Sequence, residues 1–403
     1  MRQSISLEAS PHWDHRPIKY LFTRVQRPPL DGDGIVTAFR DGQVTLRANR
    51  RAEGFTNAIQ EIGYQGIRTG DLVVHAMDGF AGAIGVSDSD GKASPVVHAY
   101  RPTDGVDARF FAYLLRNLAR RGFVTALAKG IRERSTAFDS VTLQSLVVPV
   151  PPPSDQRAIA DYLDTETARI DALIAKKRRM AETIHERLRV FISTVTSDGR
   201  TVRVRHVTSL RTSGPRGWAD LVGESGSPFI RSANLQRQSI ALRTENLAAV
   251  SAPRTSEAER SRVQNGDVLI GITGANTGWV ALPNADQVGG FVSQHVAVLR
   301  SSGVLPAWLA YSLFSTPAQD RLLGGQYGGT KQQLGLDDLA ELSVSLPNLE
   351  QQMLGVEKLV RATLDTEAVT ARLNRQIDLL VEHRQALITA AVTGELEIPG
   401  VAA

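Results

Sequence analysis

The sequence predicts an α+β protein in which two mixed α/β lobes alternate with two long helices. Three observations carry this prediction: the chain repeats itself at a spacing near 196 residues, each copy begins with short β-branched runs, and each copy ends in a long segment poor in glycine and proline. We therefore expect the first lobe at 1–150, the first helix at 151–200, the second lobe at 201–346, and the second helix and tail at 347–403.

The internal repeat rests on four pairs of segments. Their offsets are 196, 198, 195 and 195 residues, so the order of features is the same in both halves. In chain order the pairs are Gly70-Asp71-Leu72-Val73-Val74 with Gly266-Asp267-Val268-Leu269-Ile270, Phe111-Ala112-Tyr113-Leu114 with Leu309-Ala310-Tyr311-Ser312, Pro152-Pro153-Ser154-Asp155-Gln156 with Pro347-Asn348-Leu349-Glu350-Gln351, and Gly199 with Gly394. A duplicated unit of lobe followed by helix accounts for all four.

Local patterns place secondary structure inside each lobe. β-Branched runs bounded by Gly, Pro, Asn and Asp indicate strands, and apolar residues at helical spacing indicate helices. The expected strands are 72–74 and 96–100 in the first lobe and 268–272 and 295–299 in the second; the expected helices are 110–118 and 308–314.

The two long segments carry narrow apolar stripes at alternating steps of three and four residues, which is typical of a coiled coil. Ser154 or Asp155 is suited to cap the first helix, and Gly199 and Gly394 are suited to end the two helices. The side chains that we expect to pack in the seam are Ile159, Leu173, Ile184, Leu373, Ile377 and Leu387.

The length of these helices suggests a spacer. A helix of about 40 residues spans roughly 60 Å. If the second helix returns along the first, the antiparallel pair holds a lobe at each end, related by an approximate two-fold axis. Successive major-groove faces of duplex DNA lie about 34 Å apart, so two such lobes are suited to read two half-sites. Because the lobes differ in sequence, the half-sites should differ too.

Composition sets the limits of this interpretation. The absence of cysteine excludes disulfides and thiolate zinc sites and fits a reducing compartment. Residues 1–150 carry 19 Lys and Arg against 15 Asp and Glu, and 201–346 carry 13 against 11, whereas 347–403 carry 5 against 8. The basic excess therefore lies in the lobes. Neither a signal peptide nor a stretch of about 18 apolar residues is evident, so we expect a cytoplasmic protein without membrane contact.

Motifs for catalysis are missing. The Gly324 to Lys331 stretch lacks the Gly-Lys-Ser/Thr of a nucleotide-binding loop, and His185-Glu186 is followed by Arg189 where a zincin would have His. An Asn/Asp-Pro-Pro-Tyr/Phe tetrapeptide, typical of amino-methyltransferases, is absent from the sequence. The sequence predicts no catalytic residue and no metal or cofactor site in this chain.

Several of these segments resemble the specificity subunit of type I restriction-modification systems. They are the tail Arg384 to Glu395, the paired Pro-x-x-Asp/Glu-Gln motifs, the run Gly70 to Ser89, and Gly329-Thr330-Lys331-Gln332-Gln333-Leu334. The resemblance implies that each lobe is a target recognition domain for one part of a bipartite site. It also implies that the helices dock methyltransferase subunits, usually two, that restriction subunits join the full complex, and that S-adenosylmethionine, Mg and ATP act in those partners.

Arginine, lysine and small polar residues in glycine-containing segments are suited to contact phosphates and base edges. Solvated surface charges and ordinary turns are the alternative explanation for each of them. The candidates in the first lobe are Arg40, Arg47, Arg50, Arg51, His75, Phe80, Lys129, Arg132, Arg134 and Ser135. Those in the second lobe are Arg231, Asn234, Asn276, Thr277, Tyr327, Gly328, Thr330, Lys331 and Gln332. The first lobe has Gly130-Ile131-Arg132-Glu133-Arg134-Ser135 where the second has the Gly-Thr-Lys-Gln run.

Two other classes of function remain open at this point. One is a self-contained nuclease or methyltransferase, which the missing motifs disfavour. The other is a scaffold whose lobes bind proteins. Measuring DNA binding across a salt series separates the two, because a DNA-reading subunit loses affinity steeply as the salt concentration rises.

Overall fold

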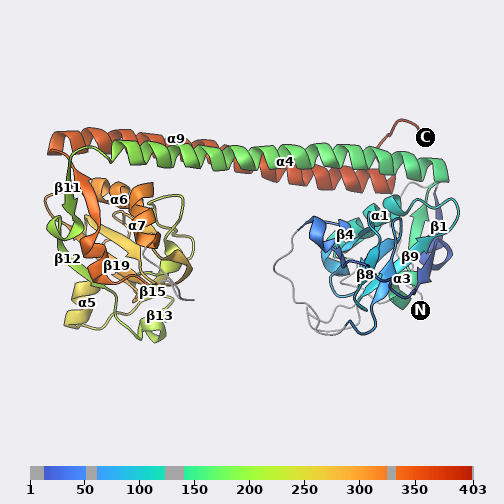
Figure 1. The fold of residues 1–403 in the computed structure, drawn as a ribbon, viewed down its shortest axis with the longest axis horizontal. Helices are drawn as coiled ribbons and strands as arrows, with labels where there is room; N and C mark the ends of the chain where they lie inside the picture. The colour runs from blue at the N-terminus through green and yellow to red at the C-terminus, as the bar shows by residue number, and fades with distance from the viewer. Residues whose placement is uncertain (1–12, 51–60, 123–139, 325–332, 402–403) are drawn as a thin grey trace. The chain divides into compact units, whose positions relative to one another are not determined.

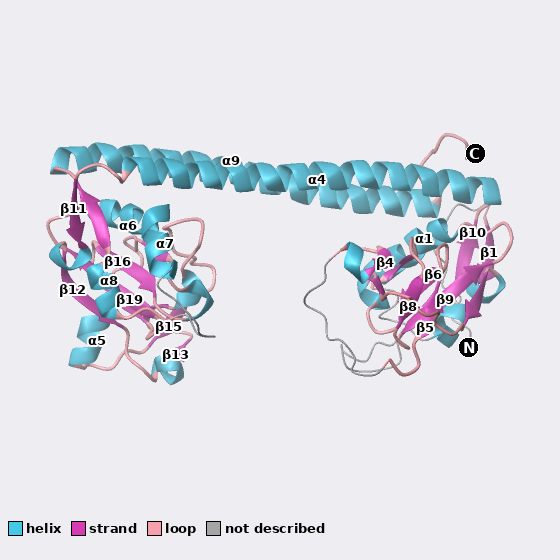
Figure 2. Cartoon of the chain, viewed as in Figure 1, coloured by secondary structure: helices cyan, strands magenta, loops and turns pink. Residues whose placement is uncertain are grey.

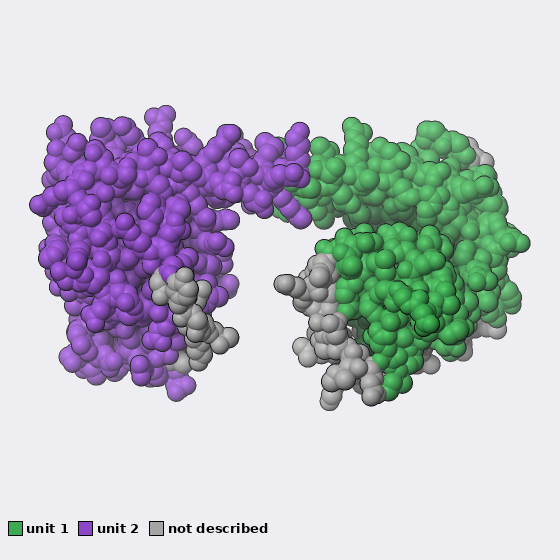
Figure 3. Space-filling view, in the orientation of Figure 1, with its two compact units in different colours: residues 1–175, 376–403 green, residues 176–375 purple. Residues whose placement is uncertain are grey.

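The computed structural model describes residues 13–50, 61–122, 140–324 and 333–401. Their contacts divide the chain into two compact units (Figure 3). Unit 1 contains Met1–Ala175 and Gln376–Ala403, and unit 2 contains Lys176–Arg375. Each unit therefore holds one lobe together with a part of both long helices.

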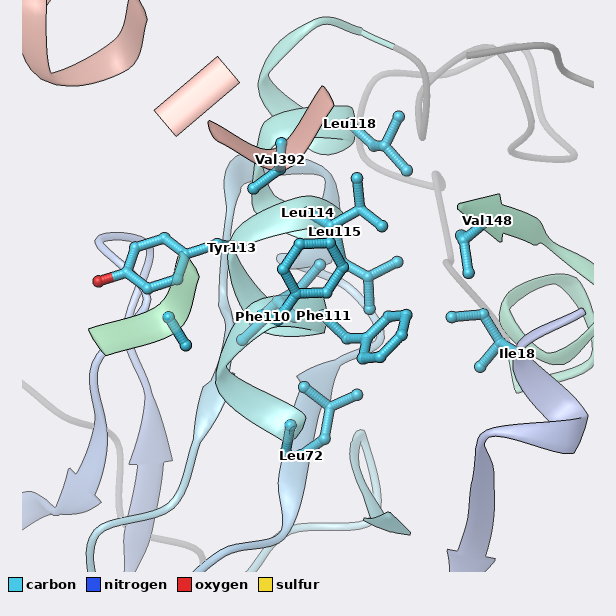
Figure 4. Close-up of a cluster of buried hydrophobic side chains, with 14 of the residues drawn as sticks. Ile18, Leu72, Phe110, Phe111, Tyr113, Leu114, Leu115, Leu118, Val148 and Val392 are labelled. Atoms are coloured by element: carbon cyan, nitrogen blue, oxygen red, sulfur yellow. The ribbon is translucent and has the colours of Figure 1, made fainter. Parts of the chain in front are cut away.

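The first lobe is built on a four-stranded antiparallel sheet. Its apolar, β-branched strands are buried, as the sequence predicts for the runs 72–74 and 96–100. In spatial order the strands are β2 (Phe22–Val25), β9 (Val97–Pro102), β6 (Leu72–His75) and β7 (Ile84–Val86). Helix α1 (Ala108–Arg120) packs against this sheet through Phe110, Phe111 and Leu114, all fully buried (Figure 4). The predicted helix 110–118 is thereby confirmed.

Smaller elements complete the first lobe. Three two-stranded pairs, β1 with β10, β3 with β4, and β5 with β8, are all antiparallel. Their bounds are Asp14–Pro17 (β1), Val147–Val150 (β10), Val36–Ala38 (β3), Val44–Leu46 (β4), Gln65–Ile67 (β5) and Gly91–Ala93 (β8), with α3 at Ser140–Ser145 and 3-10 turns η1 at Ile18–Tyr20, η2 at Arg47–Asn49 and η3 at Gly79–Ala81.

The second lobe repeats this framework (Figure 2). Its main antiparallel sheet has the order β12 (Thr208–Ser213), β19 (Val296–Ser301), β16 (Asp267–Gly271) and β17 (Val280–Ala281), and helix α6 (Pro306–Phe314) packs on it. The strands and helix expected near 268–272, 295–299 and 308–314 are therefore confirmed.

A second sheet distinguishes this lobe. It has the order β13-β15-β14-β18, and β14 and β18 run parallel. The remaining bounds are Val222–Gly223 (β13), Ala248–Val250 (β15), Ser227–Ile230 (β14), Phe291–Val292 (β18), Arg200–Arg203 (β11), Ser343–Leu346 (β20), Ser256–Ser261 (α5), Thr316–Gly324 (α7) and Leu336–Glu341 (α8), with η4 at Val204–His206, η5 at Trp218–Leu221, η6 at Ser232–Asn234 and η7 at Gly274–Asn276.

The two long segments are helices, as predicted: α4 covers Pro153–Val195 and α9 covers Leu349–Thr393 (Figure 1). In unit 1, Ile170 and Ile174 of α4 pack against Ile377 of α9. In unit 2, Leu188 and Ile192 of α4 join one apolar cluster with Leu359 of α9. Early residues of one helix meet late residues of the other in both units, so the pair is antiparallel within each unit.

The seam differs from the prediction at one residue. Leu173 is 42% exposed, and its neighbour Ile174 is 6% exposed and occupies the buried position. The buried position lies four residues after Ile170 rather than three. Apolar spacing alone does not decide between the two, because steps of three and of four residues both keep side chains on one face of a helix. Of the other expected seam residues, Ile159, Leu373 and Ile377 are buried, whereas Ile184 and Leu387 are half-buried.

A buried glutamine joins each lobe to the start of its long helix. In unit 1, Nε2 of Gln156 donates to the Pro151 carbonyl at 2.8 Å, and Oε1 accepts the N–H of Asp107, the N-cap of α1, at 2.9 Å. In unit 2, Gln352 makes the same bonds to Pro347 and to the N–H of Leu305, the N-cap of α6, both at 2.9 Å. The structural repeat therefore pairs Gln156 with Gln352, not with Gln351 as the sequence alignment suggests.

One further contact is duplicated. Tyr113 Oη lies 3.2 Å from Thr167 Oγ1, and Tyr311 Oη lies 3.0 Å from Thr363 Oγ1, so each lobe helix touches its long helix through a tyrosine. Burial raises the pKa of both phenols. The repeat thus preserves the attachment of lobe to helix in atomic detail.

None of the helices in the described part of the chain combines the length and apolar character that a bilayer-spanning segment needs.

We predict that Gln352→Leu lowers the free energy of unfolding by about 1 to 3 kcal/mol, because the buried Pro347 carbonyl and the partly buried Leu305 N–H would lose their partner. Gln351→Ala is the matched control, since Gln351 is exposed and its side chain bonds only the nearby Asn348 N–H among the described contacts. Urea unfolding followed by circular dichroism measures both; equal stability of the two variants would contradict the proposed role of Gln352.

Candidate nucleic-acid interface

In the first lobe, a hairpin and a turn bring two of the predicted side chains together. Arg40 lies in the connection between β3 and β4, and His75 lies at the end of β6. Asp78, just before η3, joins them: Arg40 Nη2 is 2.8 Å from Asp78 Oδ1, and the Asp78 N–H donates to His75 Nδ1 at 3.0 Å. The Arg40 side chain stays 67% exposed, which leaves donors free for a phosphate or a base edge.

The same hairpin positions two more arginines. Arg50 Nη2 lies 2.6 Å from Asp41 Oδ2, and its guanidinium lies 4.1 Å from the centroid of the Phe39 ring. Arg47, in η2, directs Nε toward Thr37 Oγ1 at 3.4 Å. These contacts hold Arg47 and Arg50 beside the exposed tip without covering it.

Two titratable groups at this tip have shifted pKa values. Burial lowers the pKa of His75, nearby Arg40 adds to this effect, and Asp78 opposes it. The neutral ring fits its contacts, because Nδ1 accepts the Asp78 N–H at 3.0 Å. Burial acts to raise the pKa of Asp41, but hydrogen bonds from Arg50 and the Gln43 N–H outweigh it and lower the pKa.

The other first-lobe candidates are less informative. Phe80 is partly buried and packs against the main apolar cluster of unit 1, which is a structural role. Arg51, Lys129, Arg132, Arg134 and Ser135 lie outside the described residues.

In the second lobe, the structure brings Arg231, Asn234, Asn276 and Thr277 into neighbouring turns. Asn276 Nδ2 donates to the Ser232 carbonyl at 2.7 Å and so links η7 to η6. Arg231 is exposed. The two turns therefore form one surface.

Two expectations for this surface need correction. Asn234 is 4% exposed, accepts the Arg231 N–H at 2.9 Å and donates to the Arg243 carbonyl at 3.0 Å. Thr277 is 2% exposed and donates to the Gly274 carbonyl at 2.7 Å. Both side chains are buried and shape the turns rather than face a ligand; local hydrogen bonding of Asn and Thr in turns is the competing physical reason.

The expected recognition run of the second lobe lies largely outside the described residues, including Tyr327, Gly328, Thr330, Lys331 and Gln332. Its end is placed, because Gln333 pairs with Thr273 and the Leu334 N–H donates to the Ile272 carbonyl at 2.9 Å. The chain therefore returns from this run directly beside the η7 turn.

Beside Thr273, sequence reasoning missed a polar pair, Gln294 and His295. His295 Nδ1 contacts Thr273 Oγ1, and Gln294 Nε2 lies 3.1 Å from His295 Nε2. A pocket of about 320 Å³ in the same lobe is lined by Arg189, Arg237, Trp279, Phe314 and Asp320, among others. The polar Gln-His dipeptide before strand β19 was the available sequence signal; Arg189 and Arg237 carried none, because the fold alone brings them together.

In the described ranges of the chain, no group of three or more His, Cys, Asp or Glu side chains is placed to hold a metal ion. The exposed arginines and the polar turns are instead suited to bind a polyanion through charge-assisted hydrogen bonds.

Helix α9 presents a separate apolar surface in unit 2. Leu349, Met353, Val360 and Leu364 are 40–60% exposed, and their spacing places them within about 60° on one side of the helix. The positions 196 residues earlier in α4 are Pro153, Arg157, Asp164 and Ala168. The apolar stripe of α9 is therefore not shared by α4.

Comparisons with known proteins find similarity in sequence over part of the chain, and similarity in fold. Residues 224–379 match the family model of the type I restriction modification DNA specificity domain. The chain is 22% identical over 325 residues to the specificity subunit of the type I restriction enzyme EcoBI from Escherichia coli. This alignment covers 73% of the chain but 66% of that relative, slightly less than two thirds of its length.

Two solved structures are similar in fold. One comes from work on complex assembly and conformational transition of a type I R-M system; it has a TM-score of 0.73 at 18% identity and covers 97% of this chain and 100% of that one. The other is the HsdS subunit from Thermoanaerobacter tengcongensis, with a TM-score of 0.50 at 18% identity over 96% and 98% of the two chains.

The lowered pKa of His75 predicts a pH-dependent stability. As the pH falls below the ordinary value of 6.5, the unfolded chain binds a proton before the folded chain does, so stability declines toward acid. His75→Asn keeps an acceptor for the Asp78 N–H and removes the titration, so its melting temperature should fall less between about pH 7.5 and pH 5. Parallel melting curves for parent and variant over this range would show that His75 does not contribute.

Proposed function

We propose that the chain is a specificity subunit of a type I restriction-modification system and that it reads an asymmetric, two-part DNA target, with one lobe on each half. Each lobe acts as a target recognition domain. The observation that carries the proposal is the combination of a duplicated attachment framework with unlike exposed loops.

The unlike loops account for two different half-sites. The first lobe presents arginines from the β3–β4 hairpin, whereas the second presents Arg231 and the polar turn around Asn276. Arginine prefers guanine edges and asparagine prefers adenine edges, so surfaces with different side chains select different bases. We propose Arg40, Arg47 and Arg50 as first-lobe contacts, and Arg231, Asn276, Lys331 and Gln332 as second-lobe contacts.

Helices α4 and α9 serve as the spacer in this proposal. Helix α4 runs without a break through 43 residues and α9 through 45, and each contributes to both units. In each unit the apolar seam between the helices buries Ile and Leu side chains, which an interruption of either helix would expose. The helix pair would thereby fix how many base pairs remain unread between the half-sites.

Catalysis belongs to partner subunits in this proposal. Methyltransferase subunits, two per chain, would dock on the helices, and restriction subunits would complete the assembly. S-adenosylmethionine, Mg and ATP would act in those partners, within the cytoplasm. The exposed apolar stripe of α9 supports the docking, since apolar residues at helical spacing commonly fit a groove in a partner.

The proposal is tested by selecting DNA from a random duplex pool with the chain and its cognate methyltransferase subunits. We expect a two-part sequence from the parent and no methyl transfer by the chain alone. Lys331→Ala with Gln332→Ala should relax one half-site by about 1 to 3 kcal/mol for each base edge that the variant no longer reads, and leave the other half unchanged. A change in both half-sites or in neither would show that the lobes do not read separate halves.

The apolar stripe predicts a second outcome. Met353→Lys with Leu364→Lys should weaken binding of the methyltransferase subunit at least about tenfold, since charges would replace apolar side chains whose burial contributes more than about 1.4 kcal/mol. Ala168→Lys, an exposed change at the repeat position of Leu364, is the control. Calorimetry measures all three proteins; equal affinity would place the docking surface elsewhere on the chain.

A further inference from the structure

Arg116 of α1 makes an unusual set of contacts in the first lobe. Its Nη1 donates to the Gly42 carbonyl at 3.2 Å and to the Ile84 carbonyl at 3.1 Å. Its guanidinium lies 4.6 Å from the centroid of the Tyr113 ring, and Tyr113 in turn donates to Asp164 of α4 at 2.8 Å. A single side chain thus connects the tip of the β3–β4 hairpin to the β7 strand, to α1 and toward α4.

This arginine is placed at an energetic cost. Burial, together with nearby Arg384 and Arg120, lowers the pKa of Arg116 to about 10. Within the described residues no carboxylate lies within ion-pair distance of it. A partly buried cation without an acidic partner adds little to stability compared with an apolar side chain of similar size, so its specific geometry needs another explanation.

The hairpin is shaped around this contact. Gly42 has a φ of +95°, and a Cβ added there would lie 2.2 Å from Arg116 Nη1. On the other side, a Cβ added at Gly85 of β7 would lie 2.0 Å from the Gly42 carbonyl oxygen. The Gly42 carbonyl is therefore held between β7 and Arg116, with no room for larger residues.

At the position equivalent to Arg116, the second lobe has an apolar residue. Tyr113 and Tyr311 are equivalent by their threonine contacts, so the residue three positions later in α6, Phe314, corresponds to Arg116. Phe314 is 7% exposed and apolar. The contact is thus a feature of the first lobe and not of the shared framework.

We propose that Arg116 is a positioning residue for the first half-site: it fixes the hairpin tip and thereby the direction of Arg40 and Arg50. The inference rests on the proposed function and deepens it. Arg40 lies two residues from Gly42, and Arg50 is tied to Asp41 in the same tip, so a shift of the Gly42 carbonyl would move both guanidinium groups.

The test uses the full chain in complex with its methyltransferase subunits. Arg116→Met removes the donors and keeps apolar bulk, and Arg121→Met is the control, because Arg121 caps the C-terminus of the same helix and is exposed. Two readouts are needed: base preference at each half-site by selection from a random pool, and amide hydrogen exchange of residues 36–46.

We expect Arg116→Met to reduce base preference at the first half-site about tenfold, comparable with removal of one bidentate interaction with a base. Preference at the second half-site should persist, and exchange in the hairpin should become faster, whereas Arg121→Met should behave as the parent in both readouts. Unchanged first-half preference in Arg116→Met would overturn the inference.

Loss of both half-sites would also overturn it if the milder Arg116→Gln, which keeps a side-chain N–H, behaved in the same way, since Arg116 would then serve general stability. Failure of the proposed function itself is distinguishable, because the parent complex would then select no two-part sequence at all.

Discussion

The buried amide of Gln156, and of its counterpart Gln352, is the interaction on which the rest of the architecture depends. Each amide donates a hydrogen bond to a proline carbonyl just before the long helix. It also accepts one from the N–H of the residue that caps the lobe helix. Because an unpaired buried polar group is costly, the amide is satisfied in essentially one relative placement of these two segments. The direction in which a long helix leaves its lobe is therefore set by hydrogen bonds, and the apolar seam then extends that direction.

A second buried group shows how a duplicated framework tolerates divergence. Asp71 and Asp267 are both buried and accept a backbone N–H at 2.8 Å from the residue three positions earlier. Their arginine partners differ in origin: Arg27 follows β2, whereas Arg300 belongs to β19. Both lobes thus pair the buried aspartate with an arginine, but different segments supply that arginine. The surface loops are therefore free to diverge.

The sequence predicted the elements well and the contacts less well. Strands 72–74 and 268–272 and both long helices follow from local periodicity, so they were within reach of sequence reasoning. Errors arose where neighbouring residues share a chemistry: Leu173 or Ile174 in the seam, and Gln351 or Gln352 at the junction. Asn234 and Thr277 were misjudged because polar side chains in turns bond their own backbone as readily as a ligand. Arg116 was out of reach, since its role depends on Gly42, 74 residues away.

The composition of the first lobe's core has a consequence for biosynthesis. Its apolar cluster includes Ile388, Val392 and Ile398, whereas the described residues of the corresponding cluster in the second lobe extend no further than the first half of α9. During translation the ribosome therefore makes the described core residues of the second lobe before it makes the last core residues of the first lobe. Although domains usually mature in the order in which they are made, the described core of the first lobe is completed only after the core residues of the second lobe have been made.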